Sequence, residues 1–484
     1  MNSPLRILRY NTGTDKKAFV KFKNEFDAVI FNATIVAYSG AAVADLVSVH
    51  KRQYIIDPQT HIFQHDISAL QAKNKKGRMH LKKSIEKYLN CMPEALANII
   101  IDEQRTPKVY EVESEIDELV KKVWEFETSY VDSFIKTKEY DKYLKFAKVG
   151  PIPRFLIAPY FMIKNEYDRN TNLKWLSINK SCIEKYVSLN IGEKTYDLAA
   201  QLVLDKESLL KKEYLEQIKS TYNINGYDYL FIWIDDFDSF DANYDLRQAF
   251  YELLKVFDTI GKKPIMAYGG YDSILLCNTE ITHRLYGVAQ SVGYGEARNI
   301  TPVGGGLPVN KYYFYPIHRR LRFDEAASIL SSKGYFSGKK SSSDYVKDYF
   351  DNICDCKQCY ITIKNDINNF SNYNDSIPFT MKTRYGIVSR NRPTTDASLI
   401  AAIHFLYCKI REWNEVNTRP LNSLIQDFLN AVSVYAPEWY QNIKSWCEIY
   451  ARLLELVSQP QQNYQYKIKS SMQCWLQKNG LFLI

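Results

Sequence analysis

Residues 28–57, AVIFNATIVAYSGAAVADLVSVHKRQYIID, decide the fold class of this chain. Residues 28–38 are mostly apolar and rich in β-branched side chains, and they stop at Ser39-Gly40, which predicts a buried strand. Residues 41–52 then show helical spacing, and residues 53–57 read as a second short strand that ends before a proline. A strand, a helix and a strand in this order predict one unit of a parallel sheet.

The same alternation returns further along the chain. Including the two above, we expect eight strands, and helical segments lie between several of them, for example residues 246–259. Eight such units predict an α/β fold, a (β/α)8 TIM-like barrel, whose active site lies at the C-terminal ends of the strands. A doubly wound open sheet is the competing architecture, but no glycine-rich dinucleotide loop follows the first strand. The six further strands are expected at residues 154–163, 197–204, 229–234, 264–268, 286–292 and 311–317.

This reading divides the chain into three parts. The barrel takes residues 1–335, and a polar, helical insertion at about 66–150 follows the second predicted strand. Residues 336–420 are expected to form a zinc-binding subdomain, and residues 421–484 a C-terminal helical region. The first 26 residues are basic and carry little pattern.

A cysteine cluster follows the predicted barrel. Three of the nine cysteines, Cys354, Cys356 and Cys359, form a C-x-C-x-x-C arrangement that lets three thiolates converge on one ion. A closed zinc site needs four sulfur or nitrogen ligands, and we assign the fourth to His404, on a predicted helix that runs to about residue 416. Four protein ligands leave no position for water, so the site is expected to be structural. The alternative is three ordinary reduced cysteines in a loop.

Composition limits the protein class. Hydrophobic residues make up 46% and charged residues 24% of the 484 residues, which is ordinary for a globular protein. We see neither a signal peptide nor an apolar run long enough to span a bilayer, so no membrane association is expected. The odd number of mostly isolated cysteines fits a reducing cytoplasm. The net charge of +8 favours polyanionic partners such as nucleic acid.

A basic run lies within the predicted insertion. One interpretation is a phosphate-contacting surface, and the other is a solvated helix face; the pattern does not decide between them. The nucleic-acid-binding candidates are Lys75, Lys76, Arg78, Lys82 and Lys83.

Carboxylates follow several of the predicted strands. Asp57 closes the second, Asp235 and Asp236 close the fifth, and Glu296 follows the seventh in a Gly-Tyr-Gly-Glu-Ala-Arg turn. Each alone is more often a helix cap or a salt bridge, but their shared place at one rim of a barrel indicates a catalytic site. A metal-dependent barrel hydrolase fits less well, because no His-x-His pair stands at the first strand.

Together these features resemble the tRNA-guanine transglycosylases and their DNA-modifying relatives, which exchange guanine for a 7-deazaguanine base. Residues 55–64, IIDPQTHIFQ, are similar to the family's Thr-Asp-Ser-Gly-Gly-Phe-Gln segment with its acid/base aspartate. Residues 267–270, AYGG, are similar to the Ile-Gly-Gly-Leu segment that holds the base. The resemblance spans roughly residues 28–416. It departs at residues 291–298, SVGYGEAR, where the family has its nucleophilic aspartate in Phe-Asp-x-x-x-Pro-Thr-Arg and where Glu296 could substitute.

The resemblance implies base exchange through a covalent glycosyl intermediate on a carboxylate. Glu296 or Asp235 would be the nucleophile, and Asp57 the general acid and base. Asp236 would form a hydrogen bond with the edge of the purine. The partners would be DNA or tRNA and a small 7-deazaguanine base, with structural Zn²⁺ as the cofactor. The remaining substrate-binding candidates are Tyr268, Gly269, Gly270, Tyr294 and Arg298.

Two other functions stay open. The chain could be a diverged barrel that binds nucleic acid in a defence or accessory role without exchange chemistry. It could also be a barrel hydrolase of a glycoside or nucleoside, which would not need the basic run. A homo-oligomer or a partner protein also stays open.

Overall fold

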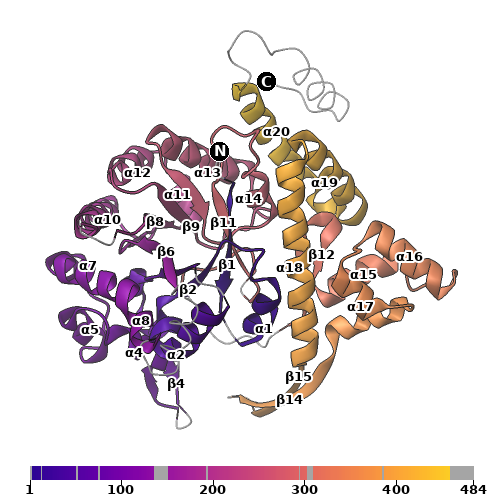
Figure 1. Cartoon of the computed structure of the whole chain (residues 1–484), viewed down its shortest axis with the longest axis horizontal. Coiled ribbons are helices and arrows are strands. Elements are labelled where there is room, and N and C mark those ends of the chain that lie inside the picture. The colour runs from indigo at the N-terminus through magenta and orange to yellow at the C-terminus, as the bar shows by residue number, and fades with distance from the viewer. Residues whose placement is uncertain are drawn as a thin grey trace.

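Eight parallel strands form a closed barrel in this computed structural model (Figure 1). The structure describes residues 3–11, 13–50, 53–74, 77–135, 151–191, 195–293, 295–301, 309–383 and 386–457. The ring order is β6-β3-β2-β1-β11-β10-β9-β8, and pairing of β8 with β6 closes it. The predicted TIM-like barrel is therefore confirmed. The strands are β1 (Leu5–Tyr10), β2 (Ala28–Asn32), β3 (Gln53–Asp57), β6 (Ile152–Ile157), β8 (Leu198–Leu204), β9 (Tyr229–Ile234), β10 (Lys263–Met266) and β11 (Gly287–Ser291).

Two of the strand predictions are wrong. The first barrel strand is β1, which was not predicted. It lies within the first 26 residues, and two arginines interrupt its apolar residues, so the segment shows no clear strand pattern. The predicted eighth strand at 311–317 is outside the barrel, where β12 (Lys311–Phe314) pairs antiparallel with β13 (Arg319–Arg322). As a result the insertion follows the third barrel strand rather than the second. The strand predicted at 28–38 also ends early, at Asn32, where α2 (Ala33–Val49) begins.

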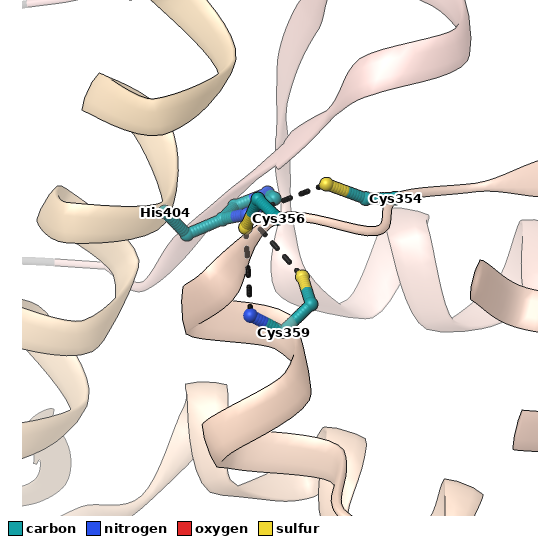
Figure 2. Close-up of side chains that lie close together, drawn as sticks. All are labelled: Cys354, Cys356, Cys359 and His404. Atoms are coloured by element: carbon teal, nitrogen blue, oxygen red, sulfur yellow. Dashed lines mark hydrogen bonds between the residues drawn. The ribbon is translucent and has the colours of Figure 1, made fainter.

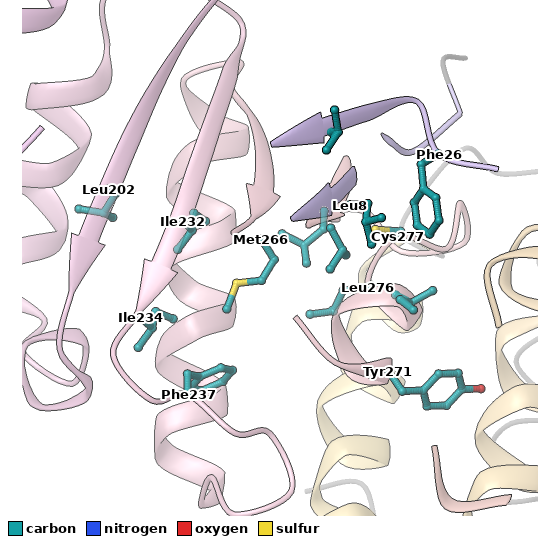
Figure 3. Close-up of a cluster of buried hydrophobic side chains, with 14 of the residues drawn as sticks. Leu8, Phe26, Leu202, Ile232, Ile234, Phe237, Met266, Tyr271, Leu276 and Cys277 are labelled. Atoms are coloured by element: carbon teal, nitrogen blue, oxygen red, sulfur yellow. The ribbon is translucent and has the colours of Figure 1, made fainter. Parts of the chain in front are cut away.

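Buried side chains form two separate cores. Successive residues of a strand point to opposite faces, so each barrel strand contributes to both cores. The outer core packs Leu8, Leu202, Ile232 and Met266 against the surrounding helices (Figure 3). The inner core fills the barrel with side chains such as Ile30, Phe231 and Ile265. The surrounding helices include α1 (Gly13–Phe22), α2, α10 (Arg169–Leu189), α12 (Glu213–Tyr222), α13 (Tyr244–Thr259) and α14 (Tyr271–Leu275).

The insertion is mainly helical, as predicted, but it opens with a β-hairpin. That hairpin joins β4 (Gln71–Lys73) to β5 (Met79–Leu81). Of the basic candidates within the described residues, Arg78 directly precedes β5, and Lys82 and Lys83 stand at the start of α4 (Lys83–Leu89). A π-helical turn, Phe126–Tyr130, lies between the last two described helices of the insertion. The other elements are α3 (Ile67–Leu70), α5 (Glu94–Ile101), α6 (Val109–Ser114), α7 (Ile116–Glu125) and α8 (Val131–Ile135).

The C-terminal region is organised around one long helix, α18 (Thr395–Thr418). This helix runs between the barrel and the smaller helices beyond it, contacting α1 and α14 on one side and α17 and β12 on the other (Figure 1). Among the helices in the described ranges, none is long and apolar enough to cross a bilayer. The other elements here are α15 (Phe323–Ser332), α16 (Ser342–Asn352), α17 (Lys357–Ile363), β14 (Ser376–Thr383), β15 (Gly386–Pro393), α19 (Leu421–Tyr435) and α20 (Tyr440–Val457).

Candidate metal centre and barrel rim

Three cysteines and a histidine converge beside α18 (Figure 2). The cysteines lie at the start of α17, where Cys356 caps the helix and its sulfur accepts the N–H of Cys359. The Nδ1 atom of His404 lies 3.3 Å from the Cys356 sulfur, 3.4 Å from the Cys359 sulfur and 4.0 Å from the Cys354 sulfur. All four ligand atoms lie within 4.8 Å of one another, so the predicted ligands form one group that could hold a metal ion.

The imidazole of His404 is oriented by its second nitrogen. Nε2 lies 2.8 Å from the carbonyl oxygen of Tyr313, and because a carbonyl can only accept, Nε2 carries the proton. The Nδ1 lone pair is then free to face the sulfurs, which is the arrangement expected of a metal-bound histidine. The ring also stacks on Tyr312, with 4.5 Å between centroids. Backbone and side chain therefore hold the ring before any ion binds.

Hydrogen bonding among the thiols favours the thiolate form of Cys356. Hydrogen bonds from Cys354, Cys359 and Cys408 lower the pKa of Cys356 far below that of an ordinary thiol. A thiolate is the form that binds a metal. Cys408 was not predicted as part of this cluster. The signal for it was its position four residues after His404, on the same face of α18.

On the opposite side of α18, Asp57 forms a buried ion pair inside the barrel. The Nη1 atom of Arg9 is 2.9 Å from an Asp57 carboxylate oxygen and 2.9 Å from the side-chain oxygen of Asn32. The hydroxyl of Tyr160 donates to the other carboxylate oxygen at 2.5 Å. Asp57 and Arg9 are both 0% exposed. The predicted acid/base residue is thus fully enclosed and accepts hydrogen bonds at both oxygens.

Replacing Arg9 by Met should destabilise the protein by about 3–5 kcal/mol, because it leaves the Asp57 carboxylate buried without its countercharge. Urea denaturation followed by circular dichroism measures the loss. As a control, Tyr160→Phe removes one hydrogen bond but keeps the charge pair, and it should cost about 1–3 kcal/mol. An Arg9→Met protein as stable as the wild type would contradict the ion-pair assignment.

A cavity of about 380 Å³ opens at the C-terminal mouth of the barrel. One wall is aromatic: His61 lies edge-on to Trp233 and stacks on Tyr160, each at 5.4 Å between centroids. Burial lowers the pKa of His61 to about 3 and that of His65 to about 2, so both imidazoles are neutral at physiological pH. Their Nδ1 atoms have no hydrogen-bond partner among the described residues. The other lining side chains include Asn32, Thr34, Gln59, Lys82, Arg298 and Ile300.

Asp235 lies next to this cavity. It directly follows β9, and its carboxylate accepts the N–H of the cavity-lining Ile300 at 2.6 Å. The side chain is half-buried, and the loss of solvent raises the pKa of Asp235 above that of an ordinary aspartate. Asp236 points outward instead, with its carboxylate 3.7 Å from Lys206. Only the first of the two aspartates is therefore close to the cavity.

Of the predicted substrate-binding residues, Tyr268, Gly269 and Gly270 follow β10, and Arg298 follows β11. Arg298 donates to the hydroxyl of Tyr268 at 2.7 Å, and the buried Tyr268 ring lies 4.3 Å from the Arg9 guanidinium carbon. At Gly269 an added Cβ would lie 2.7 Å from Ser273 and Val288, so close packing requires glycine there. At Gly270 an added Cβ would lie 3.6 Å from the Cβ of Glu296, in ordinary contact.

Glu296 is held by α18 rather than by the other carboxylates. Its carboxylate lies 2.6 Å from the ammonium of Lys409, which is fully buried. The same ammonium lies 3.0 Å from Glu412 and 2.7 Å from the Tyr313 hydroxyl, and Glu412 in turn pairs with His318 at 2.8 Å. We call Glu296, Lys409, Glu412 and His318 the α18 charge network. It joins the barrel rim to the helix that carries His404.

The basic candidates are only partly within the described structure. Lys75, Lys76 and Tyr294 lie outside the described residues. Arg78 and Lys83 are exposed. Lys82 lines the cavity at the barrel mouth, and its ammonium donates to the carbonyl of Ala69 at 2.7 Å.

No family model matches the chain, and no curated protein matches it. The metal centre and the rim are therefore the features from which a function can be inferred.

Proposed function

We propose that this chain exchanges guanine in DNA or tRNA for a 7-deazaguanine base, as the guanine transglycosylases do. The observation that carries the proposal is a half-buried carboxylate, Asp235, beside an aromatic-walled cavity at the mouth of a closed barrel. This is the end of the barrel at which enzymes of this fold carry their chemistry. A cluster of three cysteines and one histidine after the barrel gives further support.

The chemistry needs a carboxylate that can reach a sugar carbon. The Asp235 carboxylate attacks the anomeric carbon, so that a C–O bond forms as the C–N bond to guanine breaks. A general acid protonates the leaving base, and the incoming base then displaces the carboxylate with retention of configuration. We assign the acid and base work to Asp57, which accepts the N–H of the cavity-lining Gln59 at 3.3 Å. Because the carboxylate is enclosed, it reaches the base only when Tyr160 and Gln59 move aside. Because Lys409 holds Glu296, we assign that residue to positioning rather than to attack.

The cavity suits a flat heterocycle. Its volume of about 380 Å³ lies within the range of small-molecule sites. His61 and Trp233 line this cavity, and a nucleotide turned out of its strand would present its base to that lining.

We propose Zn²⁺ as the ion of the cysteine–histidine cluster, because three thiolates and an imidazole form the ligand set of a closed, tetrahedral zinc site. Bound there, zinc would brace α17 against α18 and take no part in base exchange. Seven cysteines, Cys91, Cys182, Cys277, Cys354, Cys356, Cys359 and Cys408, are free thiols, which supports a reducing compartment such as the cytoplasm.

Replacing Lys82 by Gln should weaken nucleic-acid binding uniformly across sequences and lower the slope of log K against log salt by about 1. The reason is that its ammonium lines the cavity where a flanking phosphate would lie. Fluorescence anisotropy with a labelled oligonucleotide over a range of salt concentrations measures both effects. Lys347→Gln, which removes an exposed charge from α16, is the matched control and should leave the slope unchanged. Equal slopes for wild type and Lys82→Gln would place the phosphates elsewhere.

A nucleic-acid-binding barrel without exchange activity is the second candidate. The observation that favours it is that two of the three predicted carboxylates, Asp57 and Glu296, are held in ion pairs. Trapping separates the candidates: an exchange enzyme forms a denaturant-resistant adduct with a guanine-containing oligonucleotide and incorporates labelled base. A pure binder shifts the same oligonucleotide in a native gel and forms no adduct. A nucleoside hydrolase would cleave free nucleosides, and Lys82→Gln would not affect it.

A further inference from the structure

A fifth metal-binding side chain lies against the cluster of three cysteines and His404. Cys408 is 1% exposed and stands one helical turn after His404 on α18. Its sulfur is 3.9 Å from the Cys354 sulfur and 3.8 Å from each ring nitrogen of His404. It also lies within hydrogen-bonding reach of the Cys356 thiol. Five donors therefore surround a site whose preferred ion takes four.

The position of Cys408 matches that of a ligand. Zinc–sulfur bonds of about 2.3 Å in a tetrahedron place two sulfurs about 3.8 Å apart, which is close to the separation of Cys354 and Cys408. A buried cysteine that served only as a small apolar side chain would have no need to contact three of the four donors. Within the described structure the Cys408 sulfur contacts Cys354, Cys356 and His404 but not Cys359, so Cys408 adjoins one side of the cluster.

We propose that Cys408 is a reserve ligand, which takes the fourth position when either His404 or Cys354 is not available. The centre would then hold a thiophilic divalent ion either with three cysteines and one histidine or with four cysteines. In the second form the ligand from α18 moves one turn along the helix, toward Lys409 and the α18 charge network. This inference rests on the metal binding proposed above.

Cobalt(II) is the probe, because its absorption bands report how many thiolates bind it. The full-length chain is titrated with Co²⁺ in three forms: wild type, His404→Ala and Cys354→Ser. Each substitution is also combined with Cys408→Ser. Both single variants should bind Co²⁺ within about 10-fold of the wild-type affinity, whereas each double variant should lose at least about 100-fold, as expected for loss of a ligand. The His404→Ala bands should shift to those of four thiolates.

Cys359→Ser is the matched control, since Cys359 is the one donor of the described cluster that Cys408 does not contact. It should lose affinity to the same extent with and without Cys408→Ser. If His404→Ala fails to fold, the Cys354 pair decides the question. Loss of Co²⁺ by Cys354→Ser, or binding that Cys408→Ser does not weaken, would overturn the reserve ligand. A wild-type chain that binds no Co²⁺ would overturn the metal centre as well.

Discussion

Replacing Asp235 by Asn lowers the rate of base exchange by at least about 10³-fold, since an amide cannot act as the nucleophile. The covalent adduct with an oligonucleotide disappears as well. The fold should persist, because asparagine keeps the side-chain oxygen that accepts the N–H of Ile300. Incorporation of labelled guanine measures the rate, and denaturing electrophoresis detects the adduct.

The pH dependence of exchange gives a second measurement on the same residue. The nucleophile must be ionised, and burial raises the pKa of Asp235 above its ordinary value. Activity should therefore be present above this raised pKa and lost as the pH falls through it. An acid limb in the pH–rate profile at the pKa of an ordinary aspartate would contradict this assignment.

Two control variants separate attack from positioning. Glu296→Gln keeps a polar side chain beside Lys409, whose charge Glu412 still balances, so exchange should stay within about 10-fold of wild type. Asp236→Asn alters only an exposed side chain paired with Lys206 and should change the rate less. If Glu296→Gln abolishes adduct formation and Asp235→Asn does not, Glu296 is the nucleophile.

Much of the barrel could be predicted because its strands are buried on both faces and read as apolar runs between turn residues. The β1 strand escaped prediction because Arg9 points into the barrel to pair with Asp57, and a buried arginine looks like a surface residue in sequence. The hairpin of β12 and β13 resembled a barrel strand because its apolar side chains are also buried, but against α18 and α19.

Some features of the candidate site could likewise be predicted from the sequence, and others could not. The cluster of three cysteines and a histidine could be predicted because a short cysteine spacing is a local signal. The partners of the rim carboxylates could not, because Lys409 and Glu296 are 113 residues apart and meet only in the folded chain. His61 and His65 likewise acquire their lowered pKa values from burial, which no local pattern encodes.

Removing the metal should loosen the C-terminal region and then the barrel rim. Zinc binding to a preformed set of thiolates contributes several kcal/mol or more, so we expect Cys359→Ser to lower the free energy of unfolding by at least about 3 kcal/mol. Protons compete with the ion for the thiolates, so the stabilisation should be present at neutral pH and fall as the pH drops. Thermal melts of the wild type with and without a chelator measure the same contribution. Cys91→Ser, a substitution outside the cluster, is the control and should have little effect.

The order of loosening follows from α18. The proposed metal would tie His404 on this helix to α17, and five residues later Lys409 ties the helix to Glu296 on the rim. Hydrogen exchange should therefore accelerate first in α17 and α18, and next in residues 295–301, which include the N–H that Asp235 accepts. The rate of base exchange should fall when residues 295–301 loosen, although none of the proposed metal ligands lines the cavity. If metal removal speeds exchange in α17 alone and leaves residues 295–301 protected, the α18 charge network holds the rim without help from the metal.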